Sequence, residues 1–390
     1  MNAEVEARDR KKLVAVVLGL SAVIGLMLLA FVLPSVNSGP HELKLGITGP
    51  AAATEQISTS LEAGKQGAFD TREFADADAL RDAIRNRDVV GGIAVDANGP
   101  HVLIATAGGT PIAQTLTGVA NGLSEASGAK VPVEDVVPLT ADDPTGAGLT
   151  ALALPLVFGG IMPAVVLVQL FPRSIVKRVL GAAGVAVVAG FALTAILQFG
   201  TNSLDGNYLL TALGLTMGMS AISLPILGLE SLLGMKGFAL GAVTMMFIGN
   251  PLSGMATTAA WLPAGWGALG QLLPPGAAGA SVRSMAFFDG HGATTPLLVL
   301  VCWIAVGIAL CVAAGRKKAS ARLSNRRLRW SSRRSLRTGS GRESARPRQR
   351  VPWPVRRPRC PRPSVEVGGF GAFPPPIRRR CPRRSGRPDR

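Results

Sequence analysis

The stretch LVAVVLGLSAVIGLMLLAFVL, Leu13–Leu33, decides the fold class of this chain because it holds 21 residues without a charge. An α-helix rises about 1.5 Å per residue, so this run is long enough to cross the hydrocarbon core of a bilayer, about 30 Å. The run exceeds the apolar region of a signal peptide, and Pro34–Ser38 offers no A-x-A cleavage site. We therefore expect a retained membrane anchor.

Five further apolar runs of similar length follow, at Leu149–Phe171, Val179–Phe199, Tyr208–Leu229, Phe238–Ala260 and Thr295–Ala314. The 390-residue chain is 48% hydrophobic and only 17% charged, whereas soluble proteins carry about 25% charged residues. The sequence therefore predicts an α-helical polytopic membrane protein with six transmembrane helices.

The predicted organisation has five parts. They are a cytoplasmic N-terminal segment (1–12), the first transmembrane helix (13–33), an extracytoplasmic domain (34–147), a five-helix transmembrane domain (148–314) with an extracytoplasmic loop (261–294), and a basic tail (315–390).

The orientation follows from basic residues close to the ends of the spans. One side carries twelve: Arg8, Arg10, Lys11, Lys12, Arg173, Lys177, Arg178, Lys236, Arg316, Lys317, Lys318 and Arg322. The other side carries only Lys44 and Arg283. Because cytoplasmic loops are enriched in Lys and Arg, we expect a multi-pass protein of the cell membrane with both termini in the cytoplasm.

Residues 34–147 have ordinary soluble composition and alternate between strand and helix patterns. We expect strands at Leu43–Ile47, Phe69–Phe74, Gly91–Val95, Val102–Ala105 and Val133–Leu139, and helices at Ala51–Ala63, Asp78–Arg87 and Pro111–Ser127. This alternation is typical of a small α/β domain. The loop at 261–294 carries tryptophans and prolines that suit an interfacial or re-entrant segment, and an ordinary ordered loop is the alternative.

The tail differs in composition from the rest of the chain. Residues 316–390 hold 25 of the 41 Lys and Arg and 3 of the 24 Asp and Glu, and from about Ala319 they show no helical or strand period. Three interpretations are open: out-of-frame translation of a GC-rich gene, a disordered tail on anionic lipid, and a nucleic-acid-binding segment. The third lacks any recognisable module, so we expect no nucleic-acid partner and attach no function to the tail.

Catalytic motifs are missing from the sequence. It contains no G-x-x-x-x-G-K-[ST], H-E-x-x-H or C-x-x-C pattern, and His41, His101 and His291 are widely scattered. We expect no catalytic residue, cofactor or metal, and hence no enzyme. Among ionisable residues in the spans only Glu230 stands out; we expect an interfacial carboxylate near Lys236, with a proton-carrying role in a gradient-driven carrier as the alternative.

Residues that interrupt helices form the other candidate set. Pro163, Pro225, Asn250 and Pro251 lie within predicted spans, where proline removes a backbone hydrogen bond and Asn can bond to a neighbouring helix. We predict that they line a path or form hinges, and simple packing is the alternative.

Several stretches resemble a known family. Ala79–Ile84 with Val90–Val95, then Gly249–Gly254, Leu262-Pro263, Gly270–Gly276 and Phe287–Gly290, together with the order of anchor, α/β domain and five spans, are similar to type-2 ABC exporter permeases, particularly the phage-infection-protein (Pip)-like branch. The resemblance covers roughly residues 10–315. It implies a homodimeric permease in membrane lipid that exports lipids, drugs or peptides and is energised by a separate cytoplasmic ABC ATPase.

The family's ATPase docks on a cytoplasmic helix between spans two and three. Here that connection, Pro172–Arg178, is short. The resemblance implies docking at Arg173, Lys177 and Arg178, and the short connection leaves two alternatives: either Met1–Lys12 helps with docking, or the protein does not couple to ATP at all. The alternative function is a non-transporting receptor or scaffold whose outer domain binds a cell-envelope ligand or a phage.

Overall fold

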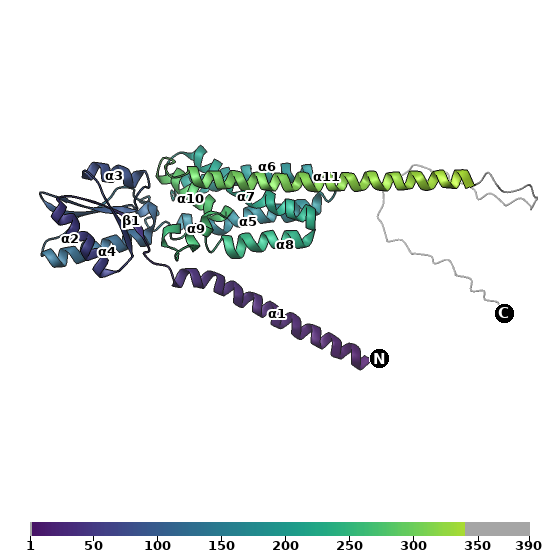
Figure 1. The fold of residues 1–390 in the computed structure, drawn as a ribbon, viewed down its shortest axis with the longest axis horizontal. Coiled ribbons are helices and arrows are strands. Elements are labelled where there is room, and N and C mark those ends of the chain that lie inside the picture. The colour runs from purple at the N-terminus through teal and green to yellow at the C-terminus, as the bar shows by residue number, and fades with distance from the viewer. Residues whose placement is uncertain (1, 340–390) are drawn as a thin grey trace, which may run out of the picture. The chain divides into compact units, whose positions relative to one another are not determined.

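The protein is described here by a computed structural model in which residues 2–339 are placed. The chain divides into two units, Met1–Arg329 and Trp330–Arg390. The first unit contains a sheet domain and a set of apolar helices (Figure 1). All contacts discussed below lie within it.

The sheet domain is a five-stranded mixed sheet in the order β2-β1-β3-β4-β5. Its strands are β1 (Leu43–Thr48), β2 (Phe69–Glu73), β3 (Gly91–Asp96), β4 (Gly99–Ile104) and β5 (Val133–Asp135), and its helices are α2 (Ala51–Gly64), α3 (Ala77–Arg85) and α4 (Thr110–Ser127). Strand β1 is parallel to β2 and β3, β4 is antiparallel to β3, and β5 is parallel to β4. The predicted strands and helices are all found, although the last strand ends at Asp135 rather than Leu139.

Local sequence signals explain why these elements form where they do. Helix α3 begins after Asp76, whose side chain accepts a hydrogen bond from the Ala79 N–H at 2.8 Å, as in an N-cap. Its buried face presents Leu80 to β1 and β3, and a Cβ at Gly46 would lie 2.1 Å from Leu80 Cδ1. Glycine at position 46 therefore permits the helix to pack directly on the central strands.

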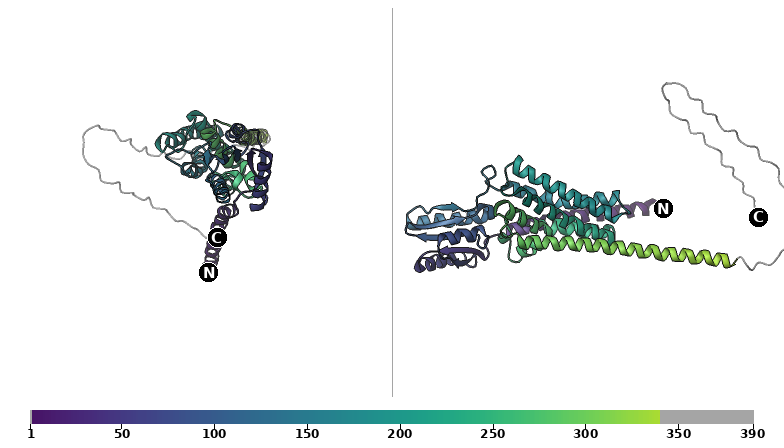
Figure 2. Two further views of the ribbon diagram at one scale, coloured as in Figure 1. Left: turned by 90° about the vertical axis from the view of Figure 1, so that its left-hand side faces the viewer. Right: turned by 90° about the horizontal axis from the view of Figure 1, so that it is seen from above.

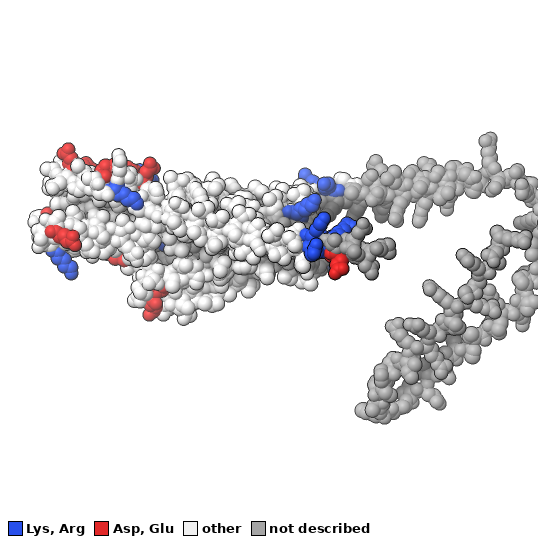
Figure 3. Space-filling view, turned by 90° about the horizontal axis from the view of Figure 1, so that it is seen from below, with Lys and Arg blue, Asp and Glu red and all other residues white. Residues whose placement is uncertain are grey.

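Five helices are long and apolar enough to cross a membrane. The segments are Arg8–Val36 of α1 (Asn2–Val36), α5 (Ala147–Leu170), Ile175–Gly200 formed by α6 (Ile175–Ala195) and the π-helix η2 (Ile196–Gly200), α7 (Tyr208–Leu233), and Thr294–Lys317 of α11 (Thr294–Gly339). Charged side chains gather at the two ends of the face in Figure 3 and leave the belt over the helices uncharged. This is the surface of a helical membrane protein.

Helix α7 is the centre of the helical part. In its most apolar stretch 78% of residues are buried, against 39% for α5 and 22% for α11. Helix α11 runs along the bundle in Figure 1 and in the right-hand view of Figure 2. It packs closely on α7, since a Cβ at Gly228 would lie 2.5 Å from Leu310 Cβ.

The predicted fifth span, Phe238–Ala260, is wrong as a continuous helix. The structure has nine residues of α-helix in α8 (Met235–Val243) and six of π-helix in η3 (Thr244–Gly249), which together span only about 22 Å. The helix ends at Gly249, with Asn250 as its C-cap, and the following Pro251 has no N–H with which to continue the hydrogen-bond ladder. Where the sequence predicts six spans, the described residues form five long apolar helices and one short one, Met235–Gly249.

The loop at 261–294 contains a buried helix. The chain forms a 3-10 turn at η4 (Ala259–Trp261) and then the helices α9 (Trp266–Gln271) and α10 (Pro274–Phe287). A separate 3-10 turn, η1 (Thr106–Gly108), lies in the sheet domain. Helix α10 is buried from Pro274 to Ala286 except at Ala280, and packs on α7 and α5. The alternative of an ordinary surface loop does not describe it.

The predicted loss of helical order near Ala319 is also wrong for part of the tail. Helix α11 continues to Gly339. No proline occurs between Pro296 and Pro347, and arginine is a good helix former. The rest of the predicted tail, 340–390, lies outside the described residues.

Close packing of α10 on α7 yields the first testable prediction. A Cβ at Gly218 of α7 would lie 2.5 Å from Ala278 Cβ of α10, whereas a Cβ at Gly184 of α6 would have no atom within 4 Å. We expect Gly218→Leu to lower the free energy of unfolding by about 1–3 kcal/mol through overpacking. The matched substitution Gly184→Leu should not lower it, and should raise it by up to about 1 kcal/mol because leucine is the better helix former. Thermal unfolding of both variants in detergent tests this, and equal stabilities would contradict the packing.

Candidate functional site

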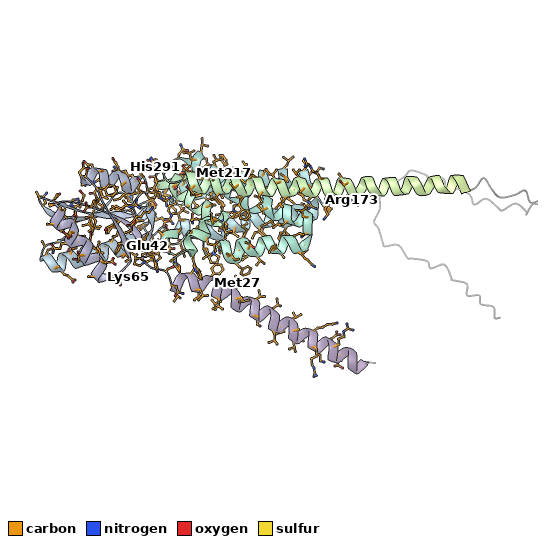
Figure 4. All side chains as sticks on the ribbon, in the orientation of Figure 1. Met27, Glu42, Lys65, Arg173, Met217 and His291 are labelled. Carbon is orange, nitrogen blue, oxygen red and sulfur yellow. The ribbon has the colours of Figure 1, made fainter. Side chains whose placement is uncertain are left out.

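The turn between α5 and α6 and the first turn of α6 hold the three residues predicted to dock an ATPase. Arg173 and Lys177 are exposed, and Arg173 lies at the end of the bundle remote from the sheet domain (Figure 4). Arg178 is only 3% exposed. Its place in the docking surface is therefore a prediction that the structure corrects.

Arg178 is committed to contacts inside the protein. Its Nη1 lies 2.5 Å from Glu230 Oε2 on α7, while Nε and Nη2 donate to the carbonyls of Phe171 and Pro172 at 2.8 and 2.9 Å. Ser174 caps α6 by accepting from the Lys177 N–H, and one helical turn later Arg178 faces α7. A count of basic residues along the sequence does not show which face of the helix Arg178 occupies.

Glu230 has a different partner from the one predicted. We expected it near Lys236, but among the described residues its ion pair is with Arg178. The side chains are 4% and 14% exposed, and Arg178 presents a permanent charge to the carboxylate. The pair ties the α5–α6 turn to the end of α7, which argues against a free proton-carrying carboxylate.

A cavity of about 260 Å³ lies at the opposite end of the bundle, beside the sheet domain. It is lined by the end of α1, the start of α5 and the loop that follows η3, and its walls include Asn250 and Pro251. Of the four predicted path residues, the sequence neighbours Asn250 and Pro251 thus both line this cavity.

The other two lie elsewhere. Pro163 is half-buried within α5, and Pro225 is buried within α7 where α11 crosses it. A Cβ at Gly307 of α11 would lie 2.6 Å from the Pro225 nitrogen. The helix crossing at Pro225 therefore matches the packing alternative.

Asn250 is placed by the π-helix before it. Its N–H donates to the Met245 carbonyl at 3.0 Å, the last wide turn of η3, and its own carbonyl accepts from Ser253 Oγ at 2.7 Å. Its side chain is 8% exposed, and Oδ1 has no hydrogen-bond partner among the described residues. Single π-turns often accompany functional sites, and a buried amide oxygen without a donor is unfavourable.

Two arginines join the sheet domain to the region around the cavity. In the sequence, Arg283 counted only as a charge near the end of a span and Arg87 only as the end of a predicted helix. Arg283 of α10 donates to the carbonyl of Ala107 in the sheet domain at 2.8 Å and to that of Met255 at 2.9 Å. Arg87 has a left-handed backbone (φ 64°), donates to Ser284 Oγ and stacks on the Phe288 ring at 5.0 Å. Burial lowers the pKa of Arg87.

A sequence signal for Arg283 does exist. It is a single arginine in the Gly- and Ala-rich segment Pro274–Phe287, and such a helix without a polar face is a buried one. Met255, whose carbonyl Arg283 holds, also lines the cavity that contains Asn250 in its wall. The junction and the cavity therefore share a wall.

Comparisons of the chain with protein families, with characterised proteins and with solved structures give no match. The resemblance to exporter permeases stays a prediction.

The ion pair gives the second testable prediction. Arg178→Gln and Glu230→Gln should each lower the free energy of unfolding by about 3–5 kcal/mol, because each leaves the other charge buried without its partner. The double substitution should cost less than the sum of the two. Arg173→Gln, in the same turn but exposed, is the control and should be nearly neutral. Additive losses in chemical denaturation would show that the two side chains do not interact.

Asn250 gives the third prediction. Asn250→Leu should leave the free energy of unfolding unchanged or raise it by about 1 kcal/mol, because it removes a buried polar group that has no partner. Thermal unfolding of the purified full chain checks this. If the substitution instead lowered the free energy of unfolding by more than about 1 kcal/mol, the Asn250 amide would be a group that stabilises the fold.

Proposed function

We propose that this protein is the membrane permease subunit of an ABC-type exporter in the cell membrane, energised by a separate cytoplasmic ATPase. The observation that carries the proposal is the arrangement of the two ends of one helical bundle. The outer cavity with the unpaired Asn250 amide lies at one end, and the exposed Arg173 and Lys177 lie at the other.

The proposed orientation puts both termini in the cytoplasm and the sheet domain outside. The exposed basic residues Arg173, Lys177 and Lys236 lie at connections α5–α6 and α7–α8, which meet at one end of an up-and-down bundle. The sheet domain is inserted between α1 and α5 at the other end. The excess of basic residues on the cytoplasmic side supports this orientation.

A separate ATPase is proposed because the described helices offer little to couple to an ion gradient. Glu230 is paired with Arg178, and ionisable groups within membrane spans normally mark ion or proton pathways. Energy would therefore enter through a partner, and the exposed basic turn offers a surface for an acidic patch on that partner. Membrane lipid and a second copy of the chain complete the proposed partners, since the apolar stretch of α1 is 0% buried.

The test of this function is co-purification of the full chain from its native membranes in detergent, with mass spectrometry of stoichiometric partners. We expect an ABC ATPase with the unaltered protein and its loss from the double variant Arg173→Glu/Lys177→Glu. The control is Lys236→Glu, an equally exposed charge reversal in another turn, which should retain the partner.

A folded, dimeric protein that reproducibly brings no ATPase would reject the proposal. The alternative, a receptor or scaffold that acts through its sheet domain, would then be the better description, because it requires no surface at the α5–α6 turn.

A further inference from the structure

Two cavities lie against the loop that follows Pro251. The outer cavity, whose wall contains Asn250, is also lined by the loop residues 253–257 and by Trp261 and Leu262. A second cavity of about 310 Å³, the junction cavity, is lined by the intervening residues 258–260, by Phe288 and by residues of the sheet domain. The lining changes from one cavity to the other between neighbouring residues, so this loop lies between the two cavities.

Residues 256–260, here called the strap, are held at both ends. The Met255 carbonyl accepts a hydrogen bond from Arg283 at 2.9 Å, and the Trp261 carbonyl accepts one from the Gly39 N–H at 2.9 Å. Between these anchors, no backbone N–H of the strap donates a hydrogen bond to any described residue. Segments with few hydrogen bonds open locally at low cost, so the strap is the part of this loop that can move.

Thr258, in the middle of the strap, has a strained backbone. Its φ is 142° and its ψ is 156°, a conformation that is essentially confined to glycine. Threonine is branched at Cβ and is therefore a genuine outlier there. Such strain persists only where the surroundings determine the conformation, and it is concentrated at clamps and switch segments.

The surroundings that hold the strap are glycines of three segments. A Cβ at Gly109, in the turn before α4 of the sheet domain, would lie 2.9 Å from Thr258 Cγ2. A Cβ at Gly254 would lie 2.6 Å from the Ala259 nitrogen, and one at Gly267 of α9 would lie 2.1 Å from the Ala259 oxygen. The strap is thus packed tightly against the sheet domain on one side and against α9 and its own loop on the other.

The two cavities are small when taken separately. Their volumes of about 260 and 310 Å³ lie below and at the lower end of the usual range for drug-sized ligands, about 300–1,000 Å³. Movement of the strap would join them into one space within that range.

We infer that the strap is a gate between the outer cavity and the junction cavity, and that strain at Thr258 favours its opening. The sheet domain holds the gate closed through the contact at Gly109. A shift of the sheet domain away from the strap lets Thr258 return to a favourable backbone conformation and joins the cavities into one passage. The inference rests on the proposed function, because this passage would be the outer part of the exporter's path.

A single cysteine in the wall of the outer cavity reports the opening of the gate. Ser253→Cys is introduced into the full chain after the four native cysteines have been replaced by serine. Ser253 is only 5% exposed, so the introduced thiol should react with a water-soluble maleimide in detergent mainly after the strap has opened. The rate of modification then follows the population of the open form.

Two neighbouring threonines provide the variant and its matched control. Thr258→Gly removes the strain from the closed conformation, so we expect the thiol to be modified about tenfold more slowly. Thr257 does not have a positive φ. Thr257→Gly should therefore leave the rate unchanged or raise it, because glycine there adds only flexibility.

Hydrogen exchange gives a second measurement on the chain with its native Ser253, which covers the case in which Ser253→Cys folds poorly. The N–H groups of Trp261 and Leu262 donate to the carbonyls of Thr258 and Ala259 at 3.2 and 3.3 Å, so they exchange when the strap opens. Thr258→Gly should slow the exchange of these two amides by about tenfold, and Thr257→Gly should not.

Equal rates in the parent and Thr258→Gly, or the same slowing by both glycine substitutions, would overturn the inference. These outcomes are distinguishable from failure of the proposed function. An ATPase partner together with thiol access that Thr258→Gly does not change rejects the gate alone. Strap-controlled access without an ATPase partner rejects the energised exporter and leaves a gated cavity.

Discussion

The close packing of α10 against α7 is the constraint on which the rest of the structure depends. Gly218 and Gly279 lack side chains where Ala278 and Met255 press against them, so α10 can be buried along almost its whole length. Its one cation, Arg283, must then be satisfied inside the protein, and it finds carbonyls of the sheet domain and of the loop. Helix α7, the sheet domain and the loop that contains Met255 are thereby all fixed to α10.

The same constraint accounts for a buried polar group that has no partner. An isolated Asn250 amide would turn toward water or take a neighbour, but the π-turn before it, the Ser253 hydroxyl and the loop held by Arg283 determine the backbone on both sides. Strained or unsatisfied groups persist where the surroundings over-determine them, and they cluster at functional sites. Asn250 is such a group, and it lies beside the cavity.

The sequence predicts the parts of this structure that depend on composition and period. Long apolar runs give five helices, and alternating patterns give every strand and helix of the sheet domain. It fails where a feature depends on backbone geometry or helical phase. The stretch from Gly249 to Ala260 contains no charged residue although the helix ends at Gly249, so the absence of charge alone extends the predicted fifth span. Arg173 and Arg178 count equally toward orientation, yet only the turn at Ser174 decides that one is exposed and the other buried.

Helices α7 and α5 both connect the region of the α5–α6 turn with the region of the cavity. Glu230, near the end of α7, binds Arg178 in the first turn of α6, and Gly218, near the middle of α7, contacts α10, which holds the Met255 loop through Arg283. Helix α1 cannot serve, because its apolar stretch is 0% buried, whereas 78% of that of α7 is. Packed interiors transmit displacement because they have few voids to absorb it. A displacement of the α5–α6 turn would therefore act on the Arg178–Glu230 pair and on α5, whose first turns line the cavity beside Asn250.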